Sequence, residues 1–296
     1  MTAAPAQIIA CIADLRRLLD QVRGRGGTIG LVPTMGALHE GHGKLIETAA
    51  HETSCVVVSI FVNPLQFDRR DDFERYPRPI SKDIAFCTAR GVSVVFTPAA
   101  EQMYPREERA FVDVARVADH LCGKFRPGHF RGVATVVLKL LNIVQPDRAY
   151  FGEKDAQQLA VIRRMIDDLN VPVCIVEVPT VREADGLAIS SRNQHLTAEE
   201  RRTAPVLYQA LAKAQTLISA GANPAETRDA ALAMLQQYPE LRVEYLEIVD
   251  PDEMQPVGRI TGPVRVAAAL WLGKTRLIDN LLCRPPARTA ENGAKS

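Results

Sequence analysis

Short apolar runs alternate with helical patterns over the first two-thirds of the chain. Five apolar runs of strand length lie at residues 28–33, 55–62, 92–97, 148–151 and 173–178. Helices are expected between them, one ending near residue 50 and others covering 80–90, 133–144 and 156–169. Strands without polar alternation are buried on both faces, which is typical of a parallel sheet covered by helices. The pattern predicts a doubly wound, Rossmann-like α/β domain over residues 1–193.

The alternation of apolar strands and helices ends after Asn193. Thr197 is a suitable N-cap, and Glu199 and Glu200 suit the first turn of a helix that we expect to run to about residue 220. A second helix is expected over 225–237, followed by strand-like runs at 243–249 and 264–272. We interpret residues 194–283 as a smaller α+β lid domain. The polar, Pro- and Ala-rich stretch 284–296 predicts a disordered tail.

Charge and cysteine content narrow the class of protein. The net charge is +1, from 36 basic and 35 acidic residues, which argues against a general nucleic-acid or membrane-surface binder. The six cysteines form no C-x-x-C pair, and several lie in apolar runs, as expected in a reducing compartment. No apolar run reaches about 18 residues and no signal peptide is recognisable, so the expected location is the cytoplasm.

The segment from Met35 to His42 (MGALHEGH) carries the strongest chemical signal. It follows the first apolar strand and leads into a helix, at the position where doubly wound sheets bind ligands with free N–H groups of helix N-termini. His39 and His42 are three residues apart, which places both imidazoles on one face of a first helical turn. Both rings can donate hydrogen bonds to phosphate oxygens. A zinc site is the rival interpretation, but no further Cys or His ligand lies nearby in sequence.

Three other clusters follow strands of the same predicted sheet. Asn63 and Gln66 come after the second strand, where a polar turn is an equally good interpretation. Lys154 stands at a helix N-terminus, where the macrodipole disfavours a cation unless an anion is bound, while Asp155 can cap that helix and Gln158 lies one turn into it. The fourth cluster, after the last strand, offers hydroxyls and a guanidinium suited to phosphates, although such a tetrapeptide is more often a linker: Ser190, Ser191, Arg192 and Asn193. The basic stretch 121–132 is expected to be a mobile loop that can cover the cleft.

Five segments in this order resemble the pantothenate synthetase (pantoate–β-alanine ligase) family: PTMGALHEGH, FVNPLQF, RPGHFRG, QPDRAYFGEKDAQQL and DGLAISSRN. The resemblance extends from about residue 30 to 193 and continues more weakly beyond. It implies ATP-dependent condensation of (R)-pantoate with β-alanine through a pantoyl adenylate, in a homodimer that uses Mg²⁺. The His pair matches the HIGH signature of the nucleotidyltransferase superfamily, with His42 as the proton donor.

The resemblance also assigns residues. It implies catalytic roles for His42, His39, Lys154 and Arg192. It also implies that Gln66 contacts pantoate and β-alanine and that Gln158 contacts pantoate. It implies an ATP site formed by Met35, Gly36, Ala37, Leu38, His39, Glu40, Gly41, His42, Gly152, Glu153, Lys154, Asp155, Val181, Ile189, Ser190, Ser191 and Arg192. The protein ligands of magnesium stay unknown, with Asp83 as a weak candidate.

Two other functions stay open on the sequence alone. A related HIGH-motif nucleotidyltransferase would need a basic pocket for a phosphorylated substrate, whereas Gln66 and Gln158 are neutral and suit a small hydroxy acid. A non-catalytic RNA-binding protein of the same fold would need a basic face with exposed aromatic residues, and aromatic residues make up only 5% of this chain.

Overall fold

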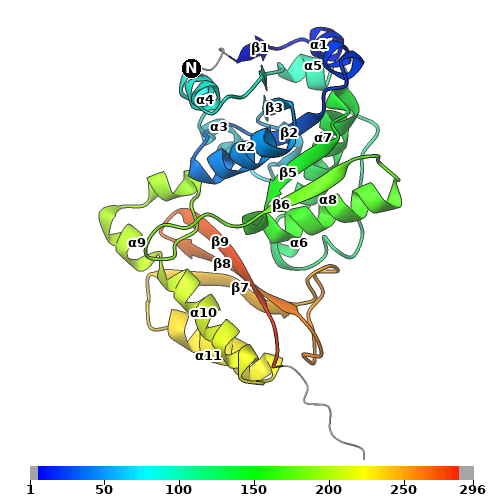
Figure 1. The fold of residues 1–296 in the computed structure, drawn as a ribbon. Coiled ribbons are helices and arrows are strands. Elements are labelled where there is room, and N and C mark those ends of the chain that lie inside the picture. The colour runs from blue at the N-terminus through cyan, green and yellow to red at the C-terminus, as the bar shows by residue number, and fades with distance from the viewer. Residues whose placement is uncertain (1–5, 287–296) are drawn as a thin grey trace, which may run out of the picture. The chain divides into compact units, whose positions relative to one another are not determined.

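The computed structural model describes residues 6–286, and the chain divides into two compact units at residues 1–195 and 196–296 (Figure 1). The first unit is built on a sheet of six strands: β1 (Gln7–Ile9), β2 (Ile29–Thr34), β3 (Cys55–Ile60), β4 (Val94–Phe96), β5 (Arg148–Gly152) and β6 (Cys174–Val178). Every pair is parallel, and the spatial order is β1-β4-β3-β2-β5-β6. The predicted doubly wound α/β fold is confirmed.

The strand order reverses direction between β2 and β5. From β2 the chain moves outward through β3 to β4, and β5 then returns to the other side of β2, with Gly30 opposite Arg148 and Leu31 opposite Ala149. Connections leave these two central strands toward different sides, and in doubly wound sheets ligands bind outside the carboxyl ends of the strands at such a switch point. The loops after β2 and β5 are the ones that the sequence marked for phosphate chemistry.

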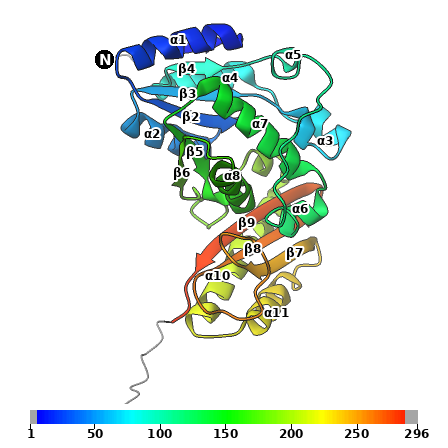
Figure 2. The same cartoon turned by 90° about the vertical axis from the view of Figure 1, so that its right-hand side faces the viewer.

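Helices cover both faces of this sheet (Figure 2). On one face, α2 (Glu40–Glu52) and α4 (Ile80–Ala89) pack Leu45, Ile46 and Cys87 against Val32, Val56 and Val58. On the other face lie α1 (Ile12–Gly24), α7 (His129–Val144) and α8 (Ala156–Asp168). The remaining elements of the unit are short: α3 (Arg70–Arg75), α5 (Ala100–Met103), α6 (Leu121–Phe125) and the 3-10 turns η1 (Pro64–Gln66), η2 (Glu153–Asp155) and η3 (Ser191–His195).

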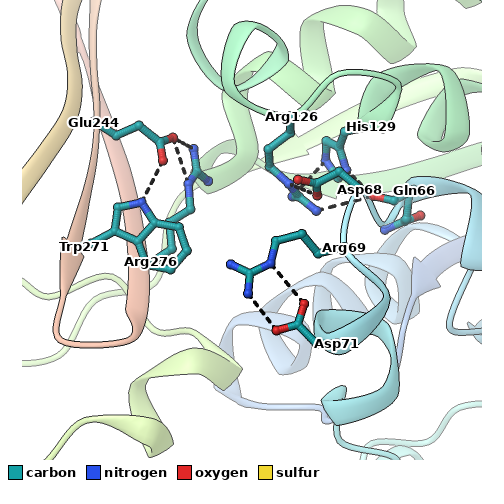
Figure 3. Close-up of polar contacts among 9 residues, drawn as sticks. All are labelled: Gln66, Asp68, Arg69, Asp71, Arg126, His129, Glu244, Trp271 and Arg276. Carbon is teal, nitrogen blue, oxygen red and sulfur yellow. Dashed lines mark hydrogen bonds and ion pairs between the residues drawn. The ribbon is translucent and has the colours of Figure 1, made fainter.

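The second unit packs helices on an antiparallel sheet with the order β7-β8-β9. Its elements are α9 (Ala198–Thr203), α10 (Val206–Ser219), α11 (Pro224–Leu235), β7 (Leu241–Val249), β8 (Val264–Leu272) and β9 (Thr275–Cys283). Helix α10 contacts β8 and β9, and α11 contacts β7. Glu244 stands at a bulge of β7, where its carboxylate accepts from Trp271 Nε1 at 2.8 Å and Arg276 Nε at 3.0 Å (Figure 3). Burial opposes ionisation of Glu244, but these two donors hold its pKa below the ordinary value.

One expectation for this second unit was wrong, and one strand was not predicted. The single helix predicted to reach residue 220 is two helices, because Pro205 has no N–H to continue the ladder after Thr203. The hairpin partner β9 was not predicted, although Gly273, at φ +57°, makes the tight turn before it. The predicted cap at Thr197 is present, since its Oγ1 accepts the Glu200 N–H at 3.2 Å. The predicted disordered tail lies outside the described residues from 287 onward.

Candidate active site

The loop between β2 and α2 is held in a left-handed bend. Gly36 has φ +84° and Ala37 has φ +52°. Thr34 Oγ1 donates to Ser59 O at 2.7 Å and accepts the Gly36 N–H at 3.2 Å, which ties the start of the loop to β3. The next two N–H groups, of Ala37 and Leu38, donate to the two carboxylate oxygens of Asp83 at 2.9 and 2.8 Å. The loop is therefore shaped by side-chain acceptors on both sides.

His39 and His42 cap the helix that follows and lie against each other. His39 is the N-cap of α2, rather than a member of its first turn, and its Nδ1 accepts the Gly41 N–H at 3.2 Å. The His39 N–H in turn donates to His42 Nδ1 at 3.3 Å, and the ring centroids are 4.1 Å apart. Because both Nδ1 atoms accept, the hydrogen-bond network places the proton of each neutral ring on Nε2. The N–H groups of the helix start that we expected to be free for an anion are in part used internally, and two Nε2–H donors take their place.

Both imidazoles are neutral near pH 7. Burial is the main cause: together with the neighbouring His39 imidazole and the positive charge of Lys154, it lowers the pKa of His42 to about 3. Burial and Lys154 lower the pKa of His39 to about 4. A neutral ring donates a hydrogen bond to a phosphate oxygen without transferring its proton, so this pair suits stabilisation of charge rather than acid catalysis.

Lys154 brings a positive charge from the end of β5 to the same place. Its side chain is only 18% exposed, its Nζ lies 3.9 Å from Asp155 Oδ2, and its charge acts on both histidines. Asp155 occupies the N-cap position of α8, but its side chain makes no capping hydrogen bond, so the expected capping role was wrong. The switch point between β2 and β5 therefore gathers two neutral donors and one cation.

Gln66 is joined to this loop from the end of β3. It is 7% exposed, and its Nε2 donates to Met35 Sδ at 2.8 Å. Asn63, which is 1% exposed, donates from Nδ2 to Gln66 Oε1 at 3.2 Å and accepts from Tyr104 Oη at 2.8 Å. This relay fixes the amide so that its N–H₂ group faces the β2 loop. Tyr104 was not recognised in the sequence, because no local motif marks it.

The basic stretch 121–132 is not the free loop that the sequence suggested. It contains α6 and the start of α7, and Arg126 and His129 contact the segment around Gln66 (Figure 3). His129 Nδ1 donates to Gln66 O at 2.7 Å, and Arg126 donates to Asp68 Oδ1 at 3.1 Å. Burial and the charge of Arg126 lower the pKa of His129 to about 4. These residues support the backbone of Gln66.

The loop after β6 forms a small hairpin beside the start of α2. The Ile189 N–H donates to Val181 O at 2.9 Å, and a Cβ on Gly41 would lie 4.0 Å from Ile189 O. Ser190 Oγ accepts the Arg192 N–H at 3.3 Å, and Ser191 hydrogen-bonds the Tyr76 side chain. The charges of Arg192 and Asp155 both influence the pKa values of His129 and Tyr76. The loops that follow β5 and β6 therefore lie near one another.

Two predicted site residues, Glu40 and Gln158, are held in other ways. Glu40 pairs with Arg90, its Oε1 lying 2.7 Å from Nη2, so its carboxylate is engaged by the residue that follows α4. The side chain of Gln158 is half-buried and makes no hydrogen bond within the described part of the chain. That of Gln157 is buried, donates to Val117 O and His120 O, and accepts the Cys122 N–H. Within residues 6–286, no group of three or more His, Cys, Asp or Glu side chains is placed to hold a metal ion. No described helix is long and apolar enough to span a bilayer.

Comparison with known proteins identifies the family. A family model described as pantoate-beta-alanine ligase matches residues 7–282. The pantothenate synthetase of Moorella thermoacetica is 50% identical over 277 residues, which cover 93% of this chain and 98% of that protein. A bifunctional pantoate ligase/cytidylate kinase of a Synechococcus species is 54% identical over 286 residues, which cover 94% of this chain and 52% of that protein.

Solved structures agree with this. A pantothenate synthetase from Thermus thermophilus superposes with a TM-score of 0.90 at 46% identity, covering 94% of this chain and all of that one. A pantoate-beta-alanine ligase from Francisella tularensis, described as complexed with beta-gamma ATP and beta-alanine, gives 0.79 at 34% identity and covers 94% and 97% of the two chains. The chain belongs to the pantoate–β-alanine ligase family.

Proposed function

We propose that the site at the β2/β5 switch point condenses (R)-pantoate with β-alanine at the expense of ATP. A pantoate carboxylate oxygen attacks the α-phosphorus, the bond to the β-phosphate breaks, and pyrophosphate leaves. The β-alanine nitrogen then attacks the acyl carbon of the adenylate, the C–O bond to AMP breaks, and the nitrogen loses a proton. The products are pantothenate, AMP and pyrophosphate.

The observation that carries this proposal is the pair of neutral imidazoles beside Lys154. Bringing a carboxylate against a triphosphate requires donors that are already in place and add no negative charge. The Nε2–H groups of His39 and His42 and the Lys154 ammonium supply them. Since both Nδ1 lone pairs already accept backbone N–H groups, neither ring is available as a base for the amine.

The remaining roles follow the resemblance. ATP lies along Met35–His42, Gly152–Asp155, Val181 and Ile189–Arg192, with Arg192 as a second cation toward the phosphates. Gln66 donates from Nε2 to pantoate, an orientation supported by its relay to Asn63, and Gln158 has an unengaged amide for the same substrate. A neutral amide suits a small hydroxy acid.

Magnesium fits this site as an ion bound mainly by the phosphates of ATP. The described residues offer no cluster of carboxylates, and both oxygens of Asp83 accept backbone N–H groups, so the residues present do not form an all-protein cage. Phosphate oxygens and water are the usual ligands of Mg²⁺ in such sites. We further propose a homodimeric enzyme of the cytoplasm, which light scattering and cell fractionation would test.

The direct test mixes the purified protein with ATP, pantoate, β-alanine and Mg²⁺, and follows products by mass spectrometry. We expect pantothenate and AMP in equal amounts, with none when any one substrate is omitted. Formation of ADP, or no pantothenate at all, would contradict the proposal.

A further inference from the structure

We propose that Asp83 is a positioning residue that holds the β2–α2 loop, and through it the two imidazoles, in the geometry that binds ATP. This inference rests on the proposed function of the site and assigns it a further residue. Asp83 lies in the first turn of α4 and is 2% exposed. Its Oδ2 accepts the Ala37 N–H at 2.9 Å and its Oδ1 accepts the Leu38 N–H at 2.8 Å.

A buried carboxylate must have its oxygens satisfied, and here both partners come from one loop. Asp83 is separated from Ala37 and Leu38 by 46 and 45 residues, so the two bonds join distant parts of the chain. Hydrogen bonds to a charged acceptor are stronger than those between neutral groups. Asp83 therefore fixes two consecutive peptide groups against α4.

The loop needs such a support because its conformation is unfavourable by itself. Ala37 has φ +52°, a left-handed conformation that an alanine adopts only against a steric cost. Its N–H group is one of the two that Asp83 binds. The carboxylate thus stabilises the residue that most resists the bend.

The shape of the loop is matched to the carboxylate. A Cβ on Gly36 would lie 2.9 Å from Asp83 Oδ2, closer than real Cβ atoms approach, and in a tight contact of 3.0 Å with Ile60 Cγ2. Gly36, at φ +84°, therefore both allows the turn and leaves room for Asp83.

The last backbone group that Asp83 holds, the Leu38 N–H, lies one residue before His39. After Leu38, the His39 N–H donates to His42 Nδ1 and His39 Nδ1 accepts from Gly41. A shift of the Leu38 peptide would turn the His39 backbone and move both Nε2–H groups. Asp83 thus acts on ATP through the loop and the rings, while its own oxygens are turned to the protein.

The same geometry replaces the role that the sequence suggested for Asp83. A magnesium ligand presents carboxylate oxygens to an accessible ion. The oxygens of Asp83 are buried and each accepts an N–H group, so it supports the loop instead of binding the ion.

The test compares Asp83→Asn with Asp147→Asn. Asp147 makes a similar bond at the other end of β2, where its Oδ2 accepts the Ile29 N–H at 2.7 Å. An amide at position 83 has one acceptor oxygen, and its NH₂ group opposes one of the two loop N–H groups. In pyrophosphate–ATP exchange we expect the KM for ATP to rise about tenfold or more in Asp83→Asn, as for a lost charge-assisted hydrogen bond. The Asp147→Asn variant should keep the wild-type KM.

A second readout separates positioning from a general loss of structure. The reaction of β-alanine with supplied pantoyl adenylate should change less than about twofold in Asp83→Asn, because that step needs no triphosphate. If Asp83→Asn folds poorly, adding Ala37→Gly relieves the left-handed strain and should recover folding but not the KM for ATP.

Three results would overturn the inference. The first is an unchanged KM for ATP in folded Asp83→Asn. The second is a return of the KM for ATP to the wild-type value when Ala37→Gly is added to Asp83→Asn. The third is a return to that value in Asp83→Asn when the Mg²⁺ concentration is raised, which would indicate a metal ligand. Wild-type protein that makes no pantothenate would instead contradict the proposed function.

Discussion

The backbone N–H of His39 donates to Nδ1 of His42 at 3.3 Å, so one catalytic candidate caps the backbone of the other. His39 does the same for Gly41 through its own Nδ1, at 3.2 Å. Each ring uses one nitrogen to build the start of α2 and leaves Nε2–H for a substrate. Structural and chemical roles are therefore assigned to different atoms of the same side chain, and substitutions can separate them.

Replacing His42 with Asn or Gln separates the two roles. The Asn oxygen stands near the position of Nδ1, so the cap survives, and we expect folded protein whose adenylation rate falls about 10²-fold through loss of the Nε2–H donor. The Gln amide reaches the position of Nε2, so it should keep more activity but lower the free energy of unfolding by about 1 kcal/mol through loss of the cap. Exchange kinetics and urea unfolding measure the two effects, and identical losses in both variants would contradict the assignment.

The activity should be insensitive to imidazole ionisation over the neutral range. The pKa values of His39 and His42 are lowered to about 4 and about 3, so both stay neutral donors well below pH 7. We expect kcat/KM for ATP to show no inflection near pH 6.5 that depends on these residues. An inflection there in the wild type that disappears in His42→Asn would disprove the neutral pair.

Stability should fall on acidification with a defined sign. Folded-state pKa values below the unfolded value of about 6.5 mean that the unfolded chain binds more protons between about pH 6.5 and 4. The contribution of neutral His39 and His42 is complete above this window, and each loses up to about 1.4 kcal/mol per pH unit within it. Urea unfolding at pH 7 and pH 5 should show a smaller loss for His42→Asn than for wild type. Equal losses would show that His42 is not buried in its neutral form.

The hydrogen bonds from Tyr104 to Asn63 and from Asn63 to Gln66 should control the affinity for pantoate. In Tyr104→Phe, Asn63 Oδ1 loses its 2.8 Å donor and keeps only the longer bond from the Leu65 N–H at 3.4 Å, which loosens the Asn63 amide that orients Gln66. We expect the KM for pantoate to rise about 5- to 10-fold, as for one hydrogen bond, with the KM for ATP unchanged. Tyr238→Phe removes a hydroxyl just after α11 in the other unit and should change neither constant. A defect confined to ATP would contradict the relay.

Gln66→Ala extends the same argument to the amide itself. Removal of the donor should weaken pantoate more than Tyr104→Phe does, again without a matching change for ATP. Steady-state kinetics with each substrate varied in turn measure this. Equal effects on both substrates would assign Gln66 to the general structure of the loop.

The sequence predicted the parallel sheet because apolar runs and helical patterns are local signals. Strands β2, β3, β5 and β6 were each placed to within two residues of their observed ends. Strand β1 was not predicted, since Gln7–Ile9 is a three-residue edge strand without a periodic pattern. The break at Pro205 and the turn at Gly273 did carry local signals that we did not use.

The supports of the site could not be predicted, because they join residues that are far apart in sequence. Asp83 reaches back 46 residues to Ala37, and His129 reaches back 63 residues to Gln66 O. Neither contact has a motif, and each depends on how α4 and α7 pack on opposite faces of the sheet. The sequence predicts candidates for the chemistry, whereas only the fold indicates what holds them in place.

Pyrophosphate–ATP exchange tests the central claim most directly. The account predicts exchange of labelled pyrophosphate into ATP that requires pantoate, proceeds without β-alanine, and falls about 10²-fold in His42→Asn. Exchange that needs β-alanine, or that continues at the wild-type rate in His42→Asn, would contradict an adenylate formed beside the paired imidazoles.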